Sequence, residues 1–169
     1  MDVDAINTLP AEEAEKALLQ CCGSKRWARE MVLARPYQNA EALIARANEV
    51  WWSLESGDWL EAFRSHPKIG EKKAADPVSD RSRQWSGQEQ AGVSNASRET
   101  VDALAALNDA YEQKFGFIFI ICATGKTSEE MLAALRKRFD NDPVAELPIA
   151  AAEQSKISEL RLKKLISCP

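Results

Sequence analysis

The sequence predicts an all-α protein, a compact single-domain bundle of about eight helices with one buried extended linker. Apolar residues recur at the i, i+3/i+4 spacing of a buried helix face along most of the chain. Capping residues, glycines and prolines stand where these periodic segments end. One continuous, β-branched apolar run, at residues 117–123, breaks the helical pattern, and no second strand is predicted to pair with it.

Length and composition are those of a globular domain. The chain has 169 residues, of which 45% are hydrophobic and 28% charged, so one core and one domain over residues 1–169 are expected. The net charge of −4 argues against nucleic acid as the main partner. No apolar run approaches membrane-spanning length, and the acidic N-terminus lacks the apolar core of a signal peptide. We therefore expect no membrane partner and a cytoplasmic location.

Helices in the N-terminal half are delimited by capping residues and glycine. Thr8 with Pro10 is expected to open the first helix, because threonine can cap and proline fits the first turn. Ser24 and Asn39 are expected to begin the second and third helices, and Gly57 to separate the third from a short fourth. That fourth helix delivers the single histidine of the chain.

The longest stretch without periodicity, residues 67–85, follows this histidine and predicts a loop, with a short turn at 86–91 after it. A loop of this length in a small domain is usually functional or mobile. A long helix is then expected from Asn95 or Ser97 to Gly116.

Two further helices are expected in the C-terminal part. Thr127-x-x-Glu130 is a capping box that opens the first of them, and Pro143 and Pro148 bracket the entry to the last. The apolar run at residues 117–123 lacks a partner strand, so it is predicted to be a buried linker between helices. Its backbone amides and carbonyls would then be left available for a ligand.

The cysteines indicate thiols in a reducing compartment rather than disulfides. There is no C-x-x-C motif, and one histidine cannot supply the usual zinc patterns. Buried or idle thiols are expected, and a magnesium site built from carboxylates alone stays open. The four cysteines are Cys21, Cys22, Cys122 and Cys168.

His66 is the first candidate for proton chemistry, because only histidine has an unperturbed pKa near neutral pH. Pro67 disfavours helical geometry at His66, so the histidine is expected at a helix end or in the following loop. Catalytic groups concentrate in loops held by a rigid scaffold. The alternative is a surface histidine that merely precedes a helix-stopping proline.

Ser86 and Glu89 have the spacing of a capping box, in which Ser86 caps a helix and Glu89 reaches back. A helix N-terminus with free N–H groups is also an anion site. In addition, Glu89 could hydrogen-bond His66 and set its tautomer or raise its pKa. Arg161 likewise has two interpretations, an exposed cation near a helix C-terminus or a fork that binds a carboxylate.

Gly125-Lys126-Thr127 suggests a phosphate loop, but the full pattern needs a glycine five residues before Gly125, where Ile120 stands. A single apolar run also fails to supply the parallel sheet of a nucleotide hydrolase. The serine nucleophile motif G-x-S-x-G is absent as well.

Four short motifs, taken in chain order, resemble the 2-oxo-4-hydroxy-4-carboxy-5-ureidoimidazoline (OHCU) decarboxylase family of the uric acid pathway. The resemblance covers nearly the whole chain. The motifs are His66-Pro67-x-x-Gly70, Ser86-x-x-Glu89-Gln90, Tyr111-Glu112-x-Lys114-Phe115-Gly116-Phe117-x-Phe119-Ile120-x-Cys122-Ala123 and Glu153-Gln154-x-Lys156-Ile157-x-x-Leu160-Arg161-Leu162.

The resemblance implies an all-helical, cofactor-independent enzyme that forms a homodimer and converts the small molecule OHCU to (S)-allantoin and CO2. It implies that His66 is catalytic, and we expect Glu89 to be its partner. Substrate contacts are implied at Pro67, Ser86, Gly87, Gln88, Glu89, Gln90, Phe119, Ile120, Ile121, Cys122, Ala123 and Arg161.

A non-catalytic helical module is the competing hypothesis. Aromatic residues at helical spacing most often belong to a core, and here they could also supply a partner surface. The tryptophans in question are Trp27, Trp51, Trp52, Trp59 and Trp85.

Overall fold

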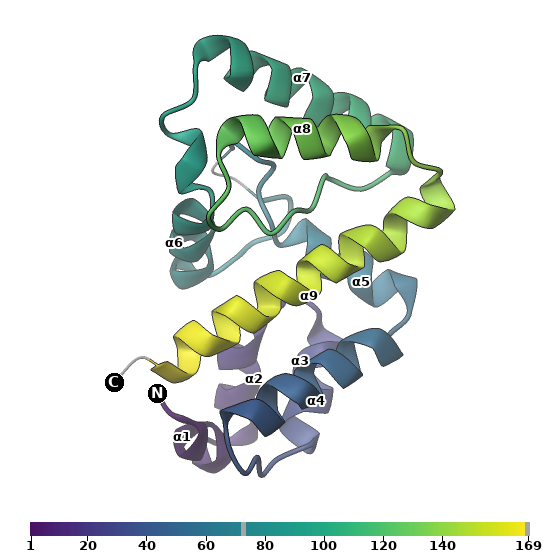
Figure 1. The fold of residues 1–169 in the computed structure, drawn as a ribbon. Coiled ribbons are helices and arrows are strands. Elements are labelled where there is room, and N and C mark those ends of the chain that lie inside the picture. The colour runs from purple at the N-terminus through teal and green to yellow at the C-terminus, as the bar shows by residue number, and fades with distance from the viewer. Residues whose placement is uncertain (72–73, 168–169) are drawn as a thin grey trace. The chain divides into compact units, whose positions relative to one another are not determined.

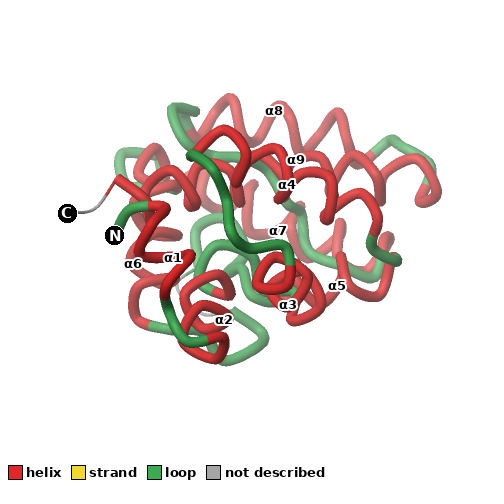
Figure 2. The backbone as a smooth tube through the Cα atoms, turned by 90° about the horizontal axis from the view of Figure 1, so that it is seen from below, coloured by secondary structure: helices red, strands yellow, loops and turns green. Residues whose placement is uncertain are grey.

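The computed structural model describes residues 1–71 and 74–167, and its regular elements there are helices (Figure 1). The predicted all-α class is confirmed, with nine α-helices and one 3-10 helix in these residues. Loops join the helices, and the described part contains no strand (Figure 2). The elements are α1 Val3–Thr8, α2 Ala11–Leu19, α3 Lys25–Leu33, α4 Ala40–Ser53, α5 Ser56–Arg64, α6 Asp80–Glu89, η1 Ala91–Val93, α7 Arg98–Phe115, α8 Ser128–Phe139 and α9 Pro143–Ser167.

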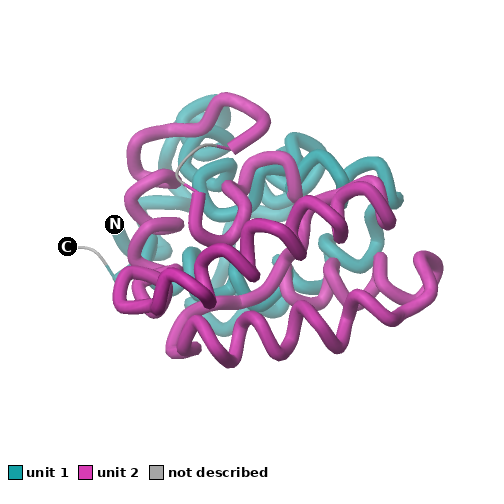
Figure 3. The backbone as a smooth tube through the Cα atoms, turned by 90° about the horizontal axis from the view of Figure 1, so that it is seen from above, with its two compact units in different colours: residues 1–62, 155–169 teal, residues 63–154 magenta. Residues whose placement is uncertain are grey.

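The chain divides into two compact units (Figure 3). Residues 1–62 and 155–169 form one, which we call the terminal unit, and residues 63–154 form the other, the central unit. The divisions fall inside α5 and α9, so each of these helices contributes residues to both units. The single domain over residues 1–169 stays a prediction.

The predicted N-caps are confirmed at four helices, where a side-chain oxygen accepts a backbone N–H from the first turn. They are Ser24 of α3, Asn39 of α4, Ser97 of α7 and Thr127 of α8. Glu130 completes the capping box of α8 by accepting the Thr127 N–H at 3.1 Å. Gly116 ends α7 with a φ of 79°, a left-handed conformation that glycine adopts without steric cost.

Three of the predicted helix boundaries are wrong. Thr8 is the last residue of a separate helix, α1, which Asp2 caps, and Pro10 is the N-cap of α2. Gly57 lies inside α5 instead of preceding it, and Pro148 lies inside α9 instead of at its entry. Both residue types disfavour a helix only locally, so the flanking residues decide whether the helix continues.

Helix α6 begins well before the turn predicted at residues 86–91. Ser79, not Ser86, is its N-cap and accepts the Ser82 N–H at 3.1 Å. The segment carried no apolar periodicity because its buried residues are polar, so the helical signal was missing from the sequence. The predicted capping box of Ser86 with Glu89, and an anion site at a helix N-terminus there, are therefore wrong.

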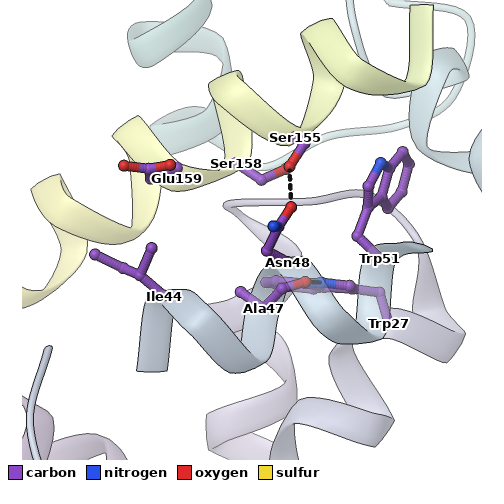
Figure 4. Close-up of a pocket in the computed structure, with 8 residues that line it drawn as sticks. All are labelled: Trp27, Ile44, Ala47, Asn48, Trp51, Ser155, Ser158 and Glu159. Atoms are coloured by element: carbon purple, nitrogen blue, oxygen red, sulfur yellow. Dashed lines mark hydrogen bonds between the residues drawn. The ribbon is translucent and has the colours of Figure 1, made fainter. Parts of the chain in front are cut away.

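Tryptophans fill the core of the terminal unit. Trp27 and Trp51 are 1% and 2% exposed, and the Trp27 Nε1–H donates to the Ala47 carbonyl at 3.0 Å. Beside them is a cavity of about 10 Å³, enough for one water molecule. Figure 4 shows its lining on α3, α4 and α9, where the Ser155 hydroxyl donates to Asn48 Oδ1 at 3.0 Å.

The central unit is built around the linker between α7 and α8, at residues 117–123 (Figure 1). The linker forms neither helix nor strand, and most of it is buried, as predicted. The Phe119 ring meets Tyr111 of α7 edge-on at 5.4 Å between centroids. Met131 and Leu135 of α8 close the same core, so two helices enclose an extended segment.

Three cysteines fall in the described residues, Cys21, Cys22 and Cys122, and all are free and buried, as expected. Cys168 lies outside the described residues. Burial raises the pKa of Cys22 to about 11, so its thiol stays protonated at neutral pH. Within residues 1–71 and 74–167, no helix has the length and apolar character needed to span a bilayer.

Candidate active site

The single histidine lies in the central unit, two residues after the end of α5, and is buried. His66 is 8% exposed, and its Nε2 lies 2.7 Å from Oε1 of Gln154 on α9. An amide oxygen only accepts hydrogen bonds, so Nε2 carries the hydrogen and a neutral ring has its lone pair on Nδ1. Gln154 therefore sets the tautomer of His66, and the surface-histidine alternative is wrong. The pairing of Glu89 with His66 stays a prediction.

The loop after His66 is fastened to the rest of the central unit. Pro67 is buried and forms an isolated β-bridge with Ala74. Gly70, at a φ of 89°, donates its N–H to Oε1 of Gln90 at 2.9 Å. The side-chain oxygen of Gln90 thus holds the loop that follows the histidine.

Helix α6 buries a polar face. Ser82, Ser86 and Glu89 are its buried residues, and their spacing places all three on one side of the helix. Burying hydroxyl and carboxyl groups is costly unless they are hydrogen-bonded, so such a face is unusual for a helix of a small domain. The site roles of Ser86 and Glu89 stay predictions, and only the local structure predicted for them is wrong.

A cavity of about 390 Å³ opens beside the C-terminal end of α6. This volume falls in the range of small-molecule sites, about 300–1,000 Å³. Gly92 brings η1 against the turn before α8, where a Cβ on Gly92 would collide with the Lys126 carbonyl. The lining residues are Gln88, Glu89, Ala91, Gly92, Asn95, Gly125, Lys126, Thr127, Ser128 and Glu129.

The linker lies among charged groups of the central unit. Burial, reinforced by the negative charge of Glu153, raises the pKa of the Cys122 thiol, so Cys122 stays protonated near neutral pH. The charges of Lys126 and Glu89 act on the same thiol. All five linker residues predicted to contact substrate are buried: Phe119, Ile120, Ile121, Cys122 and Ala123.

Of the predicted site residues, Arg161 belongs to the terminal unit and the rest to the central unit. Arg161 is 2% exposed, and its Nη1 donates to the Gln20 carbonyl at 3.4 Å. The interpretation of Arg161 as an exposed cation is therefore wrong. Gly87 and Gln88 of α6 are exposed, and Gln88 borders the cavity.

Three polar residues near these groups had no predicted role: Gln154, Arg138 and Glu146. Gln154 belongs to a motif of the resemblance, and its contact with His66 joins residues 88 positions apart. Arg138 donates Nη1–H to the Ile120 carbonyl at 2.5 Å and pairs with Glu146. In the part of the chain that the structure describes, no group of three or more histidine, cysteine or acidic side chains could hold a metal ion.

Comparison with known proteins points to one family. The family model for OHCU decarboxylase matches residues 7–163. The chain is 43% identical over 148 residues to the uric acid degradation bifunctional protein TTL of Arabidopsis thaliana, a match covering 87% of this chain and 45% of that protein. It is 31% identical to the OHCU decarboxylase of Amia calva, over 100% of this chain and 97% of that protein.

Solved structures give the same relationship. An OHCU decarboxylase crystallised in the presence of (S)-allantoin has a TM-score of 0.77 and 40% identity, over 90% of this chain and 99% of that one. An (S)-allantoin synthase has a TM-score of 0.71 at 20% identity and supports the fold alone. The chain spans less than half of the Arabidopsis protein but almost all of the Amia enzyme. By the extent of these matches, this chain belongs to the OHCU decarboxylase family.

Proposed function

We propose that the protein decarboxylates OHCU to (S)-allantoin and CO₂ in uric acid degradation. The observation that carries this proposal is the buried His66, whose tautomer is set by Gln154. The polar face of α6, the cavity and the linker belong to the same unit as this histidine. Family membership supports the choice of substrate.

The reaction needs a site for charge delocalisation and for proton transfer. The bond between the ring carbon and the carboxylate breaks, CO₂ leaves, and the electron pair enters the adjacent imine-like system of the ring. The substrate is thus its own electron sink, and we propose no cofactor. The ring nitrogen that receives the electron pair gains a proton, the hydroxyl group loses one, and carbon gains one, so the net reaction takes up one proton from solvent. The proton is added to carbon on one face only if the product is to be a single enantiomer.

His66 and Glu89 are the residues we assign to catalysis. We assign His66 as the base that accepts the substrate hydroxyl proton. A carboxylate close to an imidazolium stabilises its charged form, so Glu89 would favour the protonated ring that results. The donor of the proton that reaches carbon is left unassigned.

The other predicted residues are proposed to bind the periphery of the substrate. Backbone groups of the linker would hydrogen-bond the ring and ureido groups, and Arg161 would bind a polar or charged end. The remaining contacts are proposed at Pro67, Ser86, Gly87, Gln88 and Gln90.

The test generates OHCU from urate with urate oxidase and 5-hydroxyisourate hydrolase and then adds the protein. The OHCU absorbance band should decay faster than it does spontaneously, and circular dichroism should show excess (S)-allantoin. His66→Ala should lower kcat by about 10²–10⁴-fold, the contribution of one acid–base group, while the thermal unfolding transition persists. Unchanged turnover in a folded His66→Ala variant would contradict the assignment.

Glu89→Gln separates a catalytic carboxylate from a structural one. We expect loss of turnover with a retained fold, because glutamine keeps the size of the side chain and removes its charge. Glu12→Gln, at an exposed carboxylate of the terminal unit, is the matched control and should leave turnover unchanged.

We also propose a homodimer located in the cytoplasm. The family resemblance supports the dimer, and the apolar side chain of Val144, 84% exposed, is available to a partner. Sedimentation equilibrium should give twice the monomer mass of 18.8 kDa. A monomer at all concentrations would contradict the dimer, and imaging of a tagged protein tests the location.

A further inference from the structure

A buried ion pair in the central unit joins three helices beside the linker. Glu146 of α9 is fully buried, and its Oε1 accepts hydrogen bonds from Arg138 Nε of α8 and from the Tyr111 hydroxyl of α7, both at 2.6 Å. Its Oε2 accepts from Asn141 Nδ2 at 2.8 Å. The carboxylate is thus satisfied on both oxygens, as its burial demands.

Arg138 also contacts the linker directly. Its Nη1–H donates to the Ile120 carbonyl at 2.5 Å, and its guanidinium carbon lies 4.6 Å from the centroid of the Phe119 ring. The Nε–H of Arg138 donates a hydrogen bond to Glu146, and the planar guanidinium fixes the direction of Nη1 relative to Nε. The ion pair therefore determines where the Ile120 carbonyl points.

The orientation of this carbonyl fixes the following amide. In a trans peptide the C=O of one residue and the N–H of the next point in opposite directions. The peptide between Ile120 and Ile121 is trans, since the cis bond found in the described residues is Arg35–Pro36. Holding the Ile120 carbonyl on Arg138 thus directs the Ile121 N–H to the opposite side of the linker.

We propose that Arg138 is a positioning residue for the decarboxylation, which presents the Ile121 N–H to the substrate by holding the Ile120 carbonyl. This inference rests on the proposed function of the linker as a substrate contact. A buried ion pair adds little stability compared with apolar residues of similar volume. Its role here is to fix the orientation of the Ile120 carbonyl, because an apolar side chain could not donate a hydrogen bond to this carbonyl.

Two kinds of variant separate positioning from folding. Arg138→Lys keeps the charge next to Glu146 but has one ammonium group in place of the planar fork, so it cannot hold both partners in the same geometry. Arg138→Met combined with Glu146→Leu removes both charges and avoids leaving a buried carboxylate unpaired. Arg136→Lys and Arg136→Met, at an exposed arginine of the same helix, are the matched controls.

We expect kcat/KM for OHCU to fall by about 10–100-fold in both Arg138 variants, the cost of misplacing a binding group. The Arg136 controls should match the wild type. In amide NMR spectra, (S)-allantoin should shift the Ile121 signal of the wild type and shift it much less in Arg138→Lys. A merely structural role would move the unfolding transition but not this response.

Unchanged kcat/KM in a folded Arg138→Lys or in the double variant would overturn the inference, as would an unaltered Ile121 response to (S)-allantoin. Failure of the proposed function is seen separately, as a wild-type protein that does not accelerate OHCU decay. In that case the NMR comparison alone decides whether Arg138 directs the Ile121 N–H, and an Ile121 signal insensitive to allantoin in the wild type counts against it.

Discussion

The two units of the molecule bury different kinds of side chain. The terminal unit buries tryptophans such as Trp27 and leaves a cavity of about 10 Å³. The central unit buries His66, Glu89, Arg138 and Glu146, and it has a cavity of about 390 Å³. Among the described residues of the terminal unit, Arg161 is the buried charged side chain and the one predicted site residue.

This contrast between the units indicates where a chemical site is expected in an all-helical protein. Apolar burial stabilises the fold with little chemical consequence, whereas each buried polar group costs free energy unless it is paired. The buried, paired polar groups of the central unit are best explained by a site that needs these side chains in fixed positions. The terminal unit should therefore respond to substitutions mainly in stability, and the central unit mainly in turnover.

Trp27→Ala should give the largest loss of stability. Truncation of a fully buried tryptophan typically costs about 3–5 kcal/mol, from lost burial and the cavity left behind. The free energy of unfolding from urea titration should fall by this amount, while kcat per folded molecule is retained.

Leu33→Ala is the matched control for Trp27→Ala, because Leu33 is 76% exposed and its truncation should change stability little. A Trp27→Ala variant with normal stability and impaired turnover would break the proposed division between the units.

The helix caps show what a sequence predicts well. Ser24, Asn39 and Thr127 act on amides in the first turn of their own helices, so the whole interaction is contained in a short stretch of sequence. Helix α6 shows the limit, since its buried face consists of Ser82, Ser86 and Glu89 and has no apolar period. Patterns of hydrophobicity cannot reveal a helix that buries polar residues.

The candidate site also contains features that the sequence can reveal and contacts that it cannot. His66 is a candidate from the sequence alone because its chemistry is intrinsic to histidine, and the family motifs supply the other candidates. The contact of His66 with Gln154 and that of Arg138 with the Ile120 carbonyl arise only from tertiary structure. Both partners could equally well have been solvated side chains on helix surfaces, so no local pattern distinguishes them.

Each unit contains one tyrosine, so the two units can be compared by the pH at which each tyrosine ionises. Burial raises the pKa of Tyr37 from 10.0 to about 12. Burial, followed by the hydrogen bond to Glu146, raises the pKa of Tyr111 further, well above its usual range. On alkaline titration, the tyrosinate absorbance of Tyr37 should therefore appear before that of Tyr111.

A raised pKa means that folding favours the neutral phenol. The stability that Tyr37 contributes is present below its unfolded pKa of about 10 and is lost as the pH rises through about 12, a loss of up to about 3 kcal/mol. Tyr37→Phe should remove this part of the pH dependence, and Tyr111→Phe should leave only the Tyr37 transition. Simultaneous ionisation of both residues in the folded protein would contradict the ordering.

Two glycines give the smallest effects, with opposite signs in the two units. Gly92→Ala in the central unit would place a Cβ against the Lys126 carbonyl, a backbone atom that cannot rotate away. We expect a loss of about 1–3 kcal/mol, as for overpacking elsewhere. Gly57→Ala lies inside α5 with no atom near the added Cβ, so it should stabilise the terminal unit by about 0.5–1 kcal/mol. Equal effects of the two substitutions on the free energy of unfolding would mean that η1 and the turn before α8 do not approach closely. These two segments line the 390 Å³ cavity, so its shape would then not be fixed by their contact.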